Sequence, residues 1–123
     1  MTPETQKVEE LFTDLCKQPM HKFPQEREQL EAPSEHAVYI IRKGEIVLHV
    51  GRTLRGRDGL YKRLKDHLYG ASSFTDKYLK GDGAALRERH TYQFLVVKDA
   101  RLRALVEAYA TGRLCPKHIG LGE

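Results

Sequence analysis

The chain has few of the features that mark membrane, secreted or metal-scaffolded proteins. Its 123 residues include only two cysteines, Cys16 and Cys115, which form no CxxC pair. We therefore expect neither a thiolate zinc site nor a disulfide framework, but reduced cysteines in a cytoplasmic protein. The sequence contains no run of about 18 apolar residues, which argues against a membrane-spanning helix. Its opening residues lack the basic and apolar segments of a secretory signal.

Positive charge is in only modest excess, with 21 Lys and Arg residues against 17 Asp and Glu residues and a net charge of +4. This balance permits a nucleic-acid partner without requiring one. The basic residues gather in the middle of the chain, with one acid, Asp58, among them: Arg52, Arg55, Arg57, Lys62, Arg63 and Lys65, with Arg42 just upstream. The first 35 residues are net acidic. The sequence thus predicts a positive field around the central segment.

Hydrophobic residues make up 40% of the chain, enough for one compact core. No internal repeat is present. The apolar spacing predicts a helix over residues 3–17, and the polar, proline-containing stretch after it predicts a linker. We therefore divide the chain into residues 1–35, an N-terminal helix and linker, and residues 36–123, a compact domain.

The compact part has the pattern of a small α/β domain. Three β-rich runs are expected to form strands, at residues 37–41, 45–50 and 91–98, with a tight turn at Lys43–Gly44 joining the first two. Helical spacing and stop signals predict helices over residues 60–69 and 100–111, the second ending at Gly112. Short helical pieces are expected over residues 72–86. Together these elements predict a three-stranded mixed sheet flanked by helices.

Two residue pairs are candidates for chemistry. Arg63 and His67 are four residues apart on a predicted helix, at the border of its apolar stripe, and would suit phosphate binding or proton transfer. The alternative is that both are boundary residues with solvated tips. In the predicted hairpin, Tyr39 lies opposite Leu48, with His49 diagonal to it. The alternative for this aromatic pair is plain packing.

The glycine-rich segment 51–59 matches neither the P-loop pattern nor GxGxxG, so it does not predict a nucleotide site. Its arginines Arg52, Arg55 and Arg57, with Lys62 nearby, are expected to contact a phosphate backbone. Glu107 lies away from the apolar stripe of the last predicted helix. Periodicity alone therefore predicts an ordinary solvent-facing acid there.

Taken in order, these residues resemble the GIY-YIG nuclease superfamily, which includes the N-terminal nuclease domain of a bacterial excinuclease as well as homing and restriction endonucleases. The resemblance covers residues 36–119 and rests on an ordered set of matches: Ala37-Val38-Tyr39, His49-Val50-Gly51, Arg63 with His67, and Glu107 with Pro116. It implies a single-domain, metal-dependent endonuclease that cleaves DNA. The catalytic set implied is Tyr39, His49, Arg63, His67 and Glu107, and the implied cofactor is Mg²⁺ or Mn²⁺ held by Glu107.

The sequence departs from the family pattern at three positions. Ala37 replaces the first glycine, His49 replaces the second tyrosine, and Ile119 stands where the family has an asparagine, with His118 adjacent. These departures leave two alternatives open. The first is a catalytically weak DNA-binding module of the same fold, and the second is an interaction domain without a nucleic-acid partner.

Overall fold

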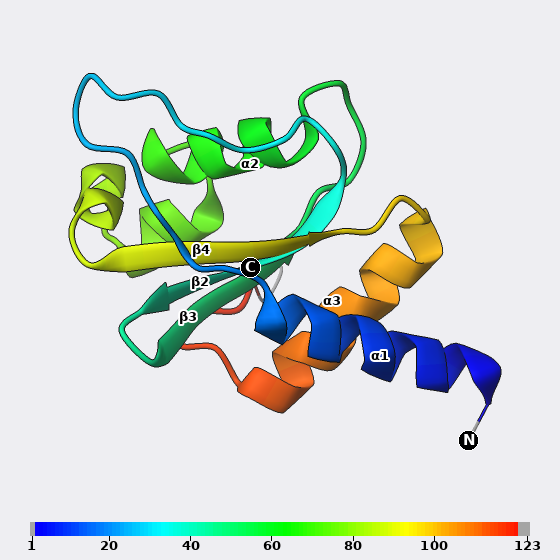
Figure 1. The fold of residues 1–123 in the computed structure, drawn as a ribbon. Helices are drawn as coiled ribbons and strands as arrows, with labels where there is room; N and C mark the ends of the chain where they lie inside the picture. Colours follow the sequence, from blue (N-terminus) through cyan, green and yellow to red (C-terminus); the bar gives the residue numbers. More distant parts are fainter. Residues whose placement is uncertain (1, 121–123) are drawn as a thin grey trace.

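The computed structural model describes residues 2–120, and over these residues the chain forms a four-stranded sheet between two layers of helix (Figure 1). The strands are β1 (His21–Lys22), β2 (Ala37–Lys43), β3 (Ile46–Arg52) and β4 (His90–Val96), in the order β1-β4-β2-β3. The predicted class is confirmed: a small sheet flanked by helices, with an additional N-terminal helix. Two details of the prediction were wrong, because β1 adds a strand within the predicted linker and every strand pair is antiparallel rather than mixed.

The hairpin of β2 and β3 has a different register from the predicted one. Its turn lies one residue later, so Lys43 pairs with Ile46, and Gly44 takes a φ of +60°. An irregularity between Ile41 and Arg42 then shifts the pairing further. As a result Tyr39 lies opposite Gly51 instead of Leu48. A bulge of this kind cannot be found from alternation, because the sequence on either side keeps its β pattern.

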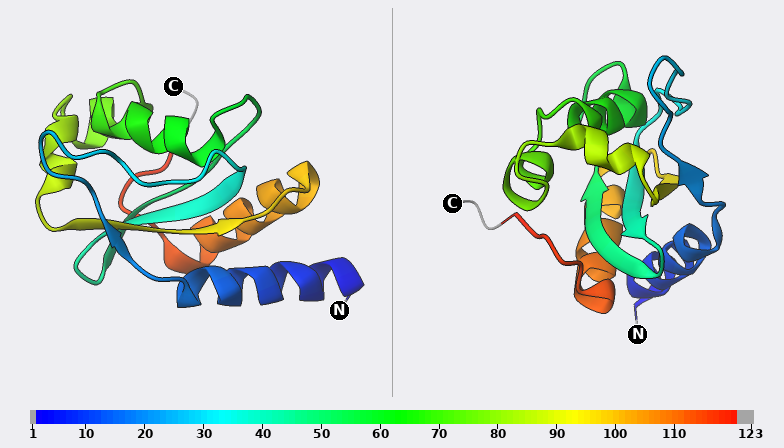
Figure 2. Two further views of the ribbon diagram at one scale, coloured as in Figure 1. Left: turned by 45° about the horizontal axis from the view of Figure 1, so that its top comes forward. Right: turned by 90° about the vertical axis from the view of Figure 1, so that its left-hand side faces the viewer.

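The helices cover the two faces of the sheet separately (Figures 1 and 2). One face carries α2 (Gly59–Leu68), the π-helical segment η1 (Phe74–Tyr78) and the 3-10 segment η2 (Gly83–Arg87). The other carries α1 (Pro3–Lys17) and α3 (Ala100–Leu114). None of the described helices is long and apolar enough to cross a membrane.

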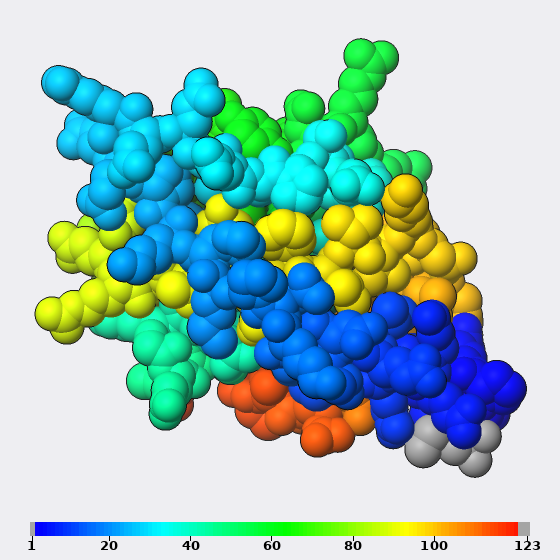
Figure 3. Space-filling model, viewed as in Figure 1, coloured from blue at the N-terminus to red at the C-terminus, as the bar shows by residue number. Residues whose placement is uncertain are grey.

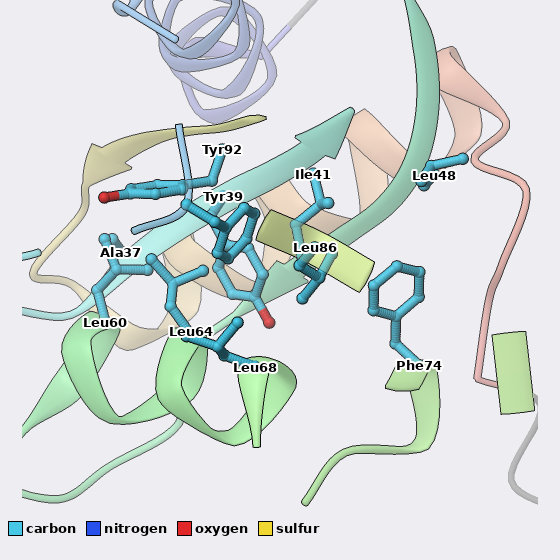
Figure 4. Packing of buried hydrophobic residues seen from close by; sticks show 11 residues of the cluster. Ala37, Tyr39, Ile41, Leu48, Leu60, Leu64, Leu68, Phe74, Leu86 and Tyr92 are labelled. Carbon is cyan, nitrogen blue, oxygen red and sulfur yellow. The ribbon is translucent and has the colours of Figure 1, made fainter. Parts of the chain in front are cut away.

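Alternation along β2 fills both layers of the core. Tyr39 and its neighbours on the same face pack against the apolar stripe of α2, a cluster shown in Figure 4. Val38 and Ile40 point to the opposite face, where Leu15 of α1 and Val106 of α3 are fully buried with them. Figure 3 shows the blue residues of the N-terminal segment lying directly against yellow and orange residues from β4 and α3.

The predicted helices were confirmed, although α2 lies one residue earlier than predicted and the end of α3 differs. Thr2 caps α1 through a bond from the Thr5 amide, and Asp99 caps α3 through a bond from the Leu102 amide. Helix α3 does not stop at Gly112 but continues to Leu114. It ends at Cys115, which adopts the left-handed conformation with a φ of +46°.

The segment after α3 returns along the outer edge of β3. The amide of Lys117 donates to the carbonyl of Val47 at 3.1 Å, and the amide of His118 donates to that of Leu48 at 2.9 Å. This tail brings His118 to the same side of the sheet as Tyr39 and α2.

Candidate active site

A buried hydrogen bond joins the first strand of the hairpin to α2. The Tyr39 hydroxyl lies 2.6 Å from Nε2 of His67, and both side chains are fully buried. Figure 4 shows the Tyr39 hydroxyl directed toward α2. Across the hairpin, a Cβ atom at Gly51 would collide with that hydroxyl, so only glycine fits there without displacing Tyr39. His67 was expected at the border of the apolar stripe but lies inside the core.

His67 is held from its other side by a segment that the sequence left ambiguous. Its Nδ1 lies 2.7 Å from the Ser72 hydroxyl, which donates to the Thr75 hydroxyl at 3.1 Å. The Thr75 hydroxyl in turn donates to the backbone carbonyl of His67. Sequence reasoning missed Ser72 and Thr75. Their only signal is spacing, since they follow the histidine by five and eight residues.

His49 lies beside this pair without bonding to it. Its ring is stacked on Phe74 with centroids 4.8 Å apart, and its centroid lies 5.1 Å from that of His67 and 5.7 Å from that of His118. Neither ring nitrogen of His49 has a hydrogen-bond partner among the described residues. Burial, with a contribution from the nearby His118, lowers its pKa to about 3, so the ring is neutral at neutral pH.

The Tyr39–His67 pair is electrically neutral at neutral pH. Burial raises the pKa of Tyr39 well above its ordinary value, and the Arg63 guanidinium opposes this shift only in part. Burial also holds the pKa of His67 well below its ordinary value, with His49 and Arg63 adding to the effect. A neutral imidazole next to a neutral phenol is a proton acceptor next to a proton donor.

Glu107 does not face solvent as helical periodicity predicted. Helix α3 packs against β3, and this brings the Glu107 carboxylate within 3.4 Å of Nε of Arg52, with 29% of each side chain exposed. Burial raises the pKa of Glu107, and Arg52 opposes that shift. Arg52 was expected on DNA phosphates; in this structure it is the counter-ion of the acid.

A hollow of about 540 Å³ collects most of the predicted catalytic residues. Tyr39, His49, Arg63 and Glu107 line it, and His67 lies outside its lining, hydrogen-bonded to Tyr39. A second hollow of about 430 Å³ shares Arg52, Arg63 and Glu107 with the first. Its lining includes two more of the predicted DNA-binding residues, Arg55 and Lys62. Arg57 is exposed on the same loop and is not part of this lining.

The loop that carries these arginines is fixed by a residue that the sequence did not indicate. Arg103 of α3 is 4% exposed and donates to the backbone carbonyls of Thr53 and Leu54 at 2.8 and 2.9 Å. It also donates to the carbonyl of Val97 at 2.9 Å. Glu107 is one helical turn further along α3, so these hydrogen bonds of Arg103 also hold Glu107 at a fixed distance from the loop.

The one carboxylate among the described lining residues of the larger hollow, that of Glu107, suits a hard divalent ion that takes a single ligand from the protein. The residues that the structure describes contain no group of three or more His, Cys, Asp or Glu side chains that could enclose a metal. Mg²⁺ requires no such cage, since it commonly binds through one or two carboxylates, waters and substrate phosphates. The half-buried carboxylate of Glu107, at a hollow also lined by Arg63, fits that mode.

Comparison with known proteins gives matches at the level of structure. No protein-family model matches the chain, and a search of curated proteins finds no match. Among solved structures, the GIY-YIG N-terminal endonuclease domain of Thermotoga maritima UvrC, bound to its catalytic magnesium, matches with a TM-score of 0.55 and 21% identity. The match covers 72% of this chain and 88% of that one. A point mutant of that domain, with its catalytic divalent cation, matches with a TM-score of 0.54. The chain has the GIY-YIG fold.

Within this GIY-YIG fold, two of the departures from the family pattern lie at one wall of the hollow. His49 contacts the tail residue His118, which also lies 3.5 Å from the Ser73 hydroxyl. Ile119 lines the hollow and is 48% exposed, so it adds apolar surface where the family pattern has an amide.

Proposed function

We propose that the protein is a metal-dependent endonuclease that hydrolyses phosphodiester bonds in DNA. The observation that carries this proposal is the convergence of Tyr39, Arg63 and Glu107 on one hollow, with the phenol bonded to a neutral imidazole behind it. Together they offer a route for a proton, a cation for phosphoryl oxygens and a ligand for a metal. The similarity to an endonuclease domain of the same fold supports the reaction class.

Tyr39 is assigned the transfer of the proton from the attacking water. A phenol is a poor base at neutral pH, and burial makes a free phenolate less accessible still. The hydrogen bond to His67 removes this difficulty, because the phenol can give its own proton to Nε2 as it receives one from water. Burial keeps the pKa of His67 low, so the imidazole is unprotonated at neutral pH and can hold the proton only for the duration of the transfer.

Arg63 is assigned the stabilisation of charge that develops on the phosphoryl oxygens. It lies one helical turn before His67 and lines both hollows. Its planar fork of donors matches phosphate oxygens. A preorganised cation in such a place contributes most when charge accumulates at the transition state.

Glu107 is the residue that would hold Mg²⁺ or Mn²⁺. When bound, the ion would supply charge neutralisation at the scissile phosphate and at the departing oxygen. The pairing of Arg52 with Glu107 holds the carboxylate in place and opposes the rise in its pKa that burial causes. Arg55, Arg57 and Lys62 would hold the DNA backbone through its phosphates, without reading bases.

A DNA-binding module with weak cleavage is the second candidate. The observation that favours it is His49, which stands where the family has a tyrosine and whose ring nitrogens are buried without partners among the described residues. The His49 side chain therefore makes no hydrogen bond to the described residues of the site, while the hollow lined by Arg52, Arg55 and Lys62 is still able to bind phosphates.

Plasmid nicking separates the two candidates. Supercoiled DNA is incubated with the wild type, Glu107→Gln and the control Glu9→Gln, with and without Mg²⁺ or Mn²⁺. Glu9 lies on α1, on the far side of the sheet from α2. Metal-dependent nicking by the wild type and the control, lost in Glu107→Gln, supports the nuclease. DNA binding by all three proteins with no nicking supports the binding module.

A further inference from the structure

The hydrogen bonds behind Tyr39 form a chain in which every proton can be assigned. Its members are His67, Ser72 and Thr75, all buried. The assignment begins at the far end, where the Thr75 hydroxyl contacts the backbone carbonyl of His67. A carbonyl only accepts, so the single hydroxyl proton of Thr75 is committed to it.

Ser72 is therefore left with one possible role toward Thr75. The two hydroxyl oxygens are 3.1 Å apart, and because the proton of Thr75 is already used, Ser72 donates. The Thr75 amide also donates to the Ser72 oxygen at 3.1 Å. Ser72 has no second proton to give to His67, whose Nδ1 lies 2.7 Å away. The proton in that contact must belong to Nδ1.

We infer that Ser72 and Thr75 are positioning residues that fix neutral His67 in its Nδ1–H tautomer, so that Nε2 presents a free lone pair to the Tyr39 hydroxyl. This inference rests on the proposed function for its catalytic meaning, but the position of the proton is a property of the protein alone. Neither residue touches DNA or the metal in this assignment. Both act through His67.

The tautomer decides whether the proposed proton transfer can occur. With the lone pair on Nε2, water gives a proton to the Tyr39 oxygen while the Tyr39 proton moves to Nε2. The phenol is regenerated, His67 becomes an imidazolium, and the hydroxide formed is free to attack phosphorus. In the other tautomer Nε2 already carries a proton and donates it to the Tyr39 oxygen, so it has no lone pair with which to accept one.

The alternative proton arrangement breaks the hydrogen bond between Ser72 and Thr75. If Ser72 donated to Nδ1, the Ser72 and Thr75 oxygens would face each other at 3.1 Å with no proton between them. Two lone pairs would then oppose each other across a buried contact, and the Thr75 oxygen would lose the hydrogen bond that it accepts from Ser72. Removing the Thr75 hydroxyl would lift this constraint, since the Ser72 proton would then be free to turn toward Nδ1.

Nitrogen-15 NMR on the free protein tests the tautomer directly. Long-range ¹H–¹⁵N correlations of the ring distinguish a protonated from an unprotonated nitrogen, and the His67 signals are assigned by their loss in His67→Gln. We expect a protonated Nδ1 and a bare Nε2 in the wild type. Thr75→Val, which is nearly isosteric, should move the population toward Nε2–H, whereas Thr75→Ser should retain the wild-type pattern.

Cleavage measurements on the same proteins supply the second readout. Thr75→Val should lower kcat by about 10- to 100-fold, the range typical of partners that orient a functional histidine, with little change in KM for DNA. Thr13→Val is the matched control, because the Thr13 hydroxyl also donates to a backbone carbonyl but lies on α1; it should change neither readout. Ser72→Ala should lower kcat as Thr75→Val does.

Each result has a distinct meaning. A proton on Nε2 in the wild type, or an unchanged tautomer in Thr75→Val, overturns the inference whatever the activity. The expected tautomers in a protein that cleaves no DNA would overturn the proposed function and leave the tautomer assignment standing.

Discussion

Acidification from pH 7 to pH 5 should destabilise the fold through its two buried histidines at the site. The pKa of His49 is lowered to about 3, so its ring stays neutral in the folded protein at pH 5, and burial lowers the pKa of His67 in the same direction. In the unfolded chain each titrates near a pKa of about 6.5 and binds a proton as the pH falls. The unfolded state therefore gains protons that the folded state does not. Stability is retained above about pH 6.5 and is lost progressively below it.

The expected size follows from that linkage. A histidine that titrates only in the unfolded state stabilises that state by about 2 kcal/mol between pH 7 and pH 5, so His49 contributes about 2 kcal/mol, and His67 adds a loss of the same sign. This is an appreciable share of the stability of about 5–15 kcal/mol that is usual for a protein domain. The measurement is the free energy of unfolding in urea at both pH values.

Two variants make the measurement decisive. His49→Phe removes one titrating ring but keeps an aromatic side chain against Phe74, so the loss of stability between pH 7 and pH 5 should fall by about 2 kcal/mol. Phe74→Leu is the control, because it weakens packing at both pH values while both histidines remain. An identical pH dependence in the wild type and His49→Phe would refute the reasoning.

Three further predictions concern the hollow. Arg63→Lys should lower kcat for cleavage by about 100-fold with nearly unchanged DNA binding, because an ammonium does not reproduce the guanidinium fork; near-normal turnover would count against the assigned role. Arg52→Gln should tighten Mn²⁺ binding to the DNA-free protein by about fivefold, since it removes about 1 kcal/mol of repulsion beside Glu107. Manganese EPR measures this, and unchanged or weaker binding would contradict it. Gly51→Ala should abolish cleavage and lower the unfolding free energy by about 1–3 kcal/mol, because the added methyl group collides with the Tyr39 hydroxyl; an active, equally stable variant would disprove that packing.

The sequence predicted the positions of the helices and longer strands better than the register in which the strands pair. Hydrophobic periodicity and capping residues located α1, α2, α3 and the three longer strands. The short strand β1 carries no such signal, since its two residues, His21 and Lys22, are polar and pair only because β4 offers an edge. The register of the hairpin depends on a bulge, which is a property of the folded backbone.

The site was predictable only in part, for a similar reason. Tyr39 and Arg63 were candidates from their spacing on predicted elements, whereas Glu107 was identified only through the family resemblance, since periodicity alone placed it in solvent. Local patterns do not reveal which helix face meets the end of a strand. Ser72 and Arg103 were missed because their importance lies in buried hydrogen bonds to residues that only the tertiary structure brings near.

The tail that runs along β3 has a consequence for aggregation as well as for the site. Unpaired strand edges are templates for association between molecules, and proteins commonly shield them. Here the amides of Lys117 and His118 donate hydrogen bonds to the carbonyls of Val47 and Leu48 on the outer edge of β3. The same residues deliver His118 to the wall of the hollow. Proteolytic removal of this tail would therefore expose an unpaired strand edge and remove this wall of the hollow in a single cut, so that one cleavage would both alter the candidate site and favour association between molecules.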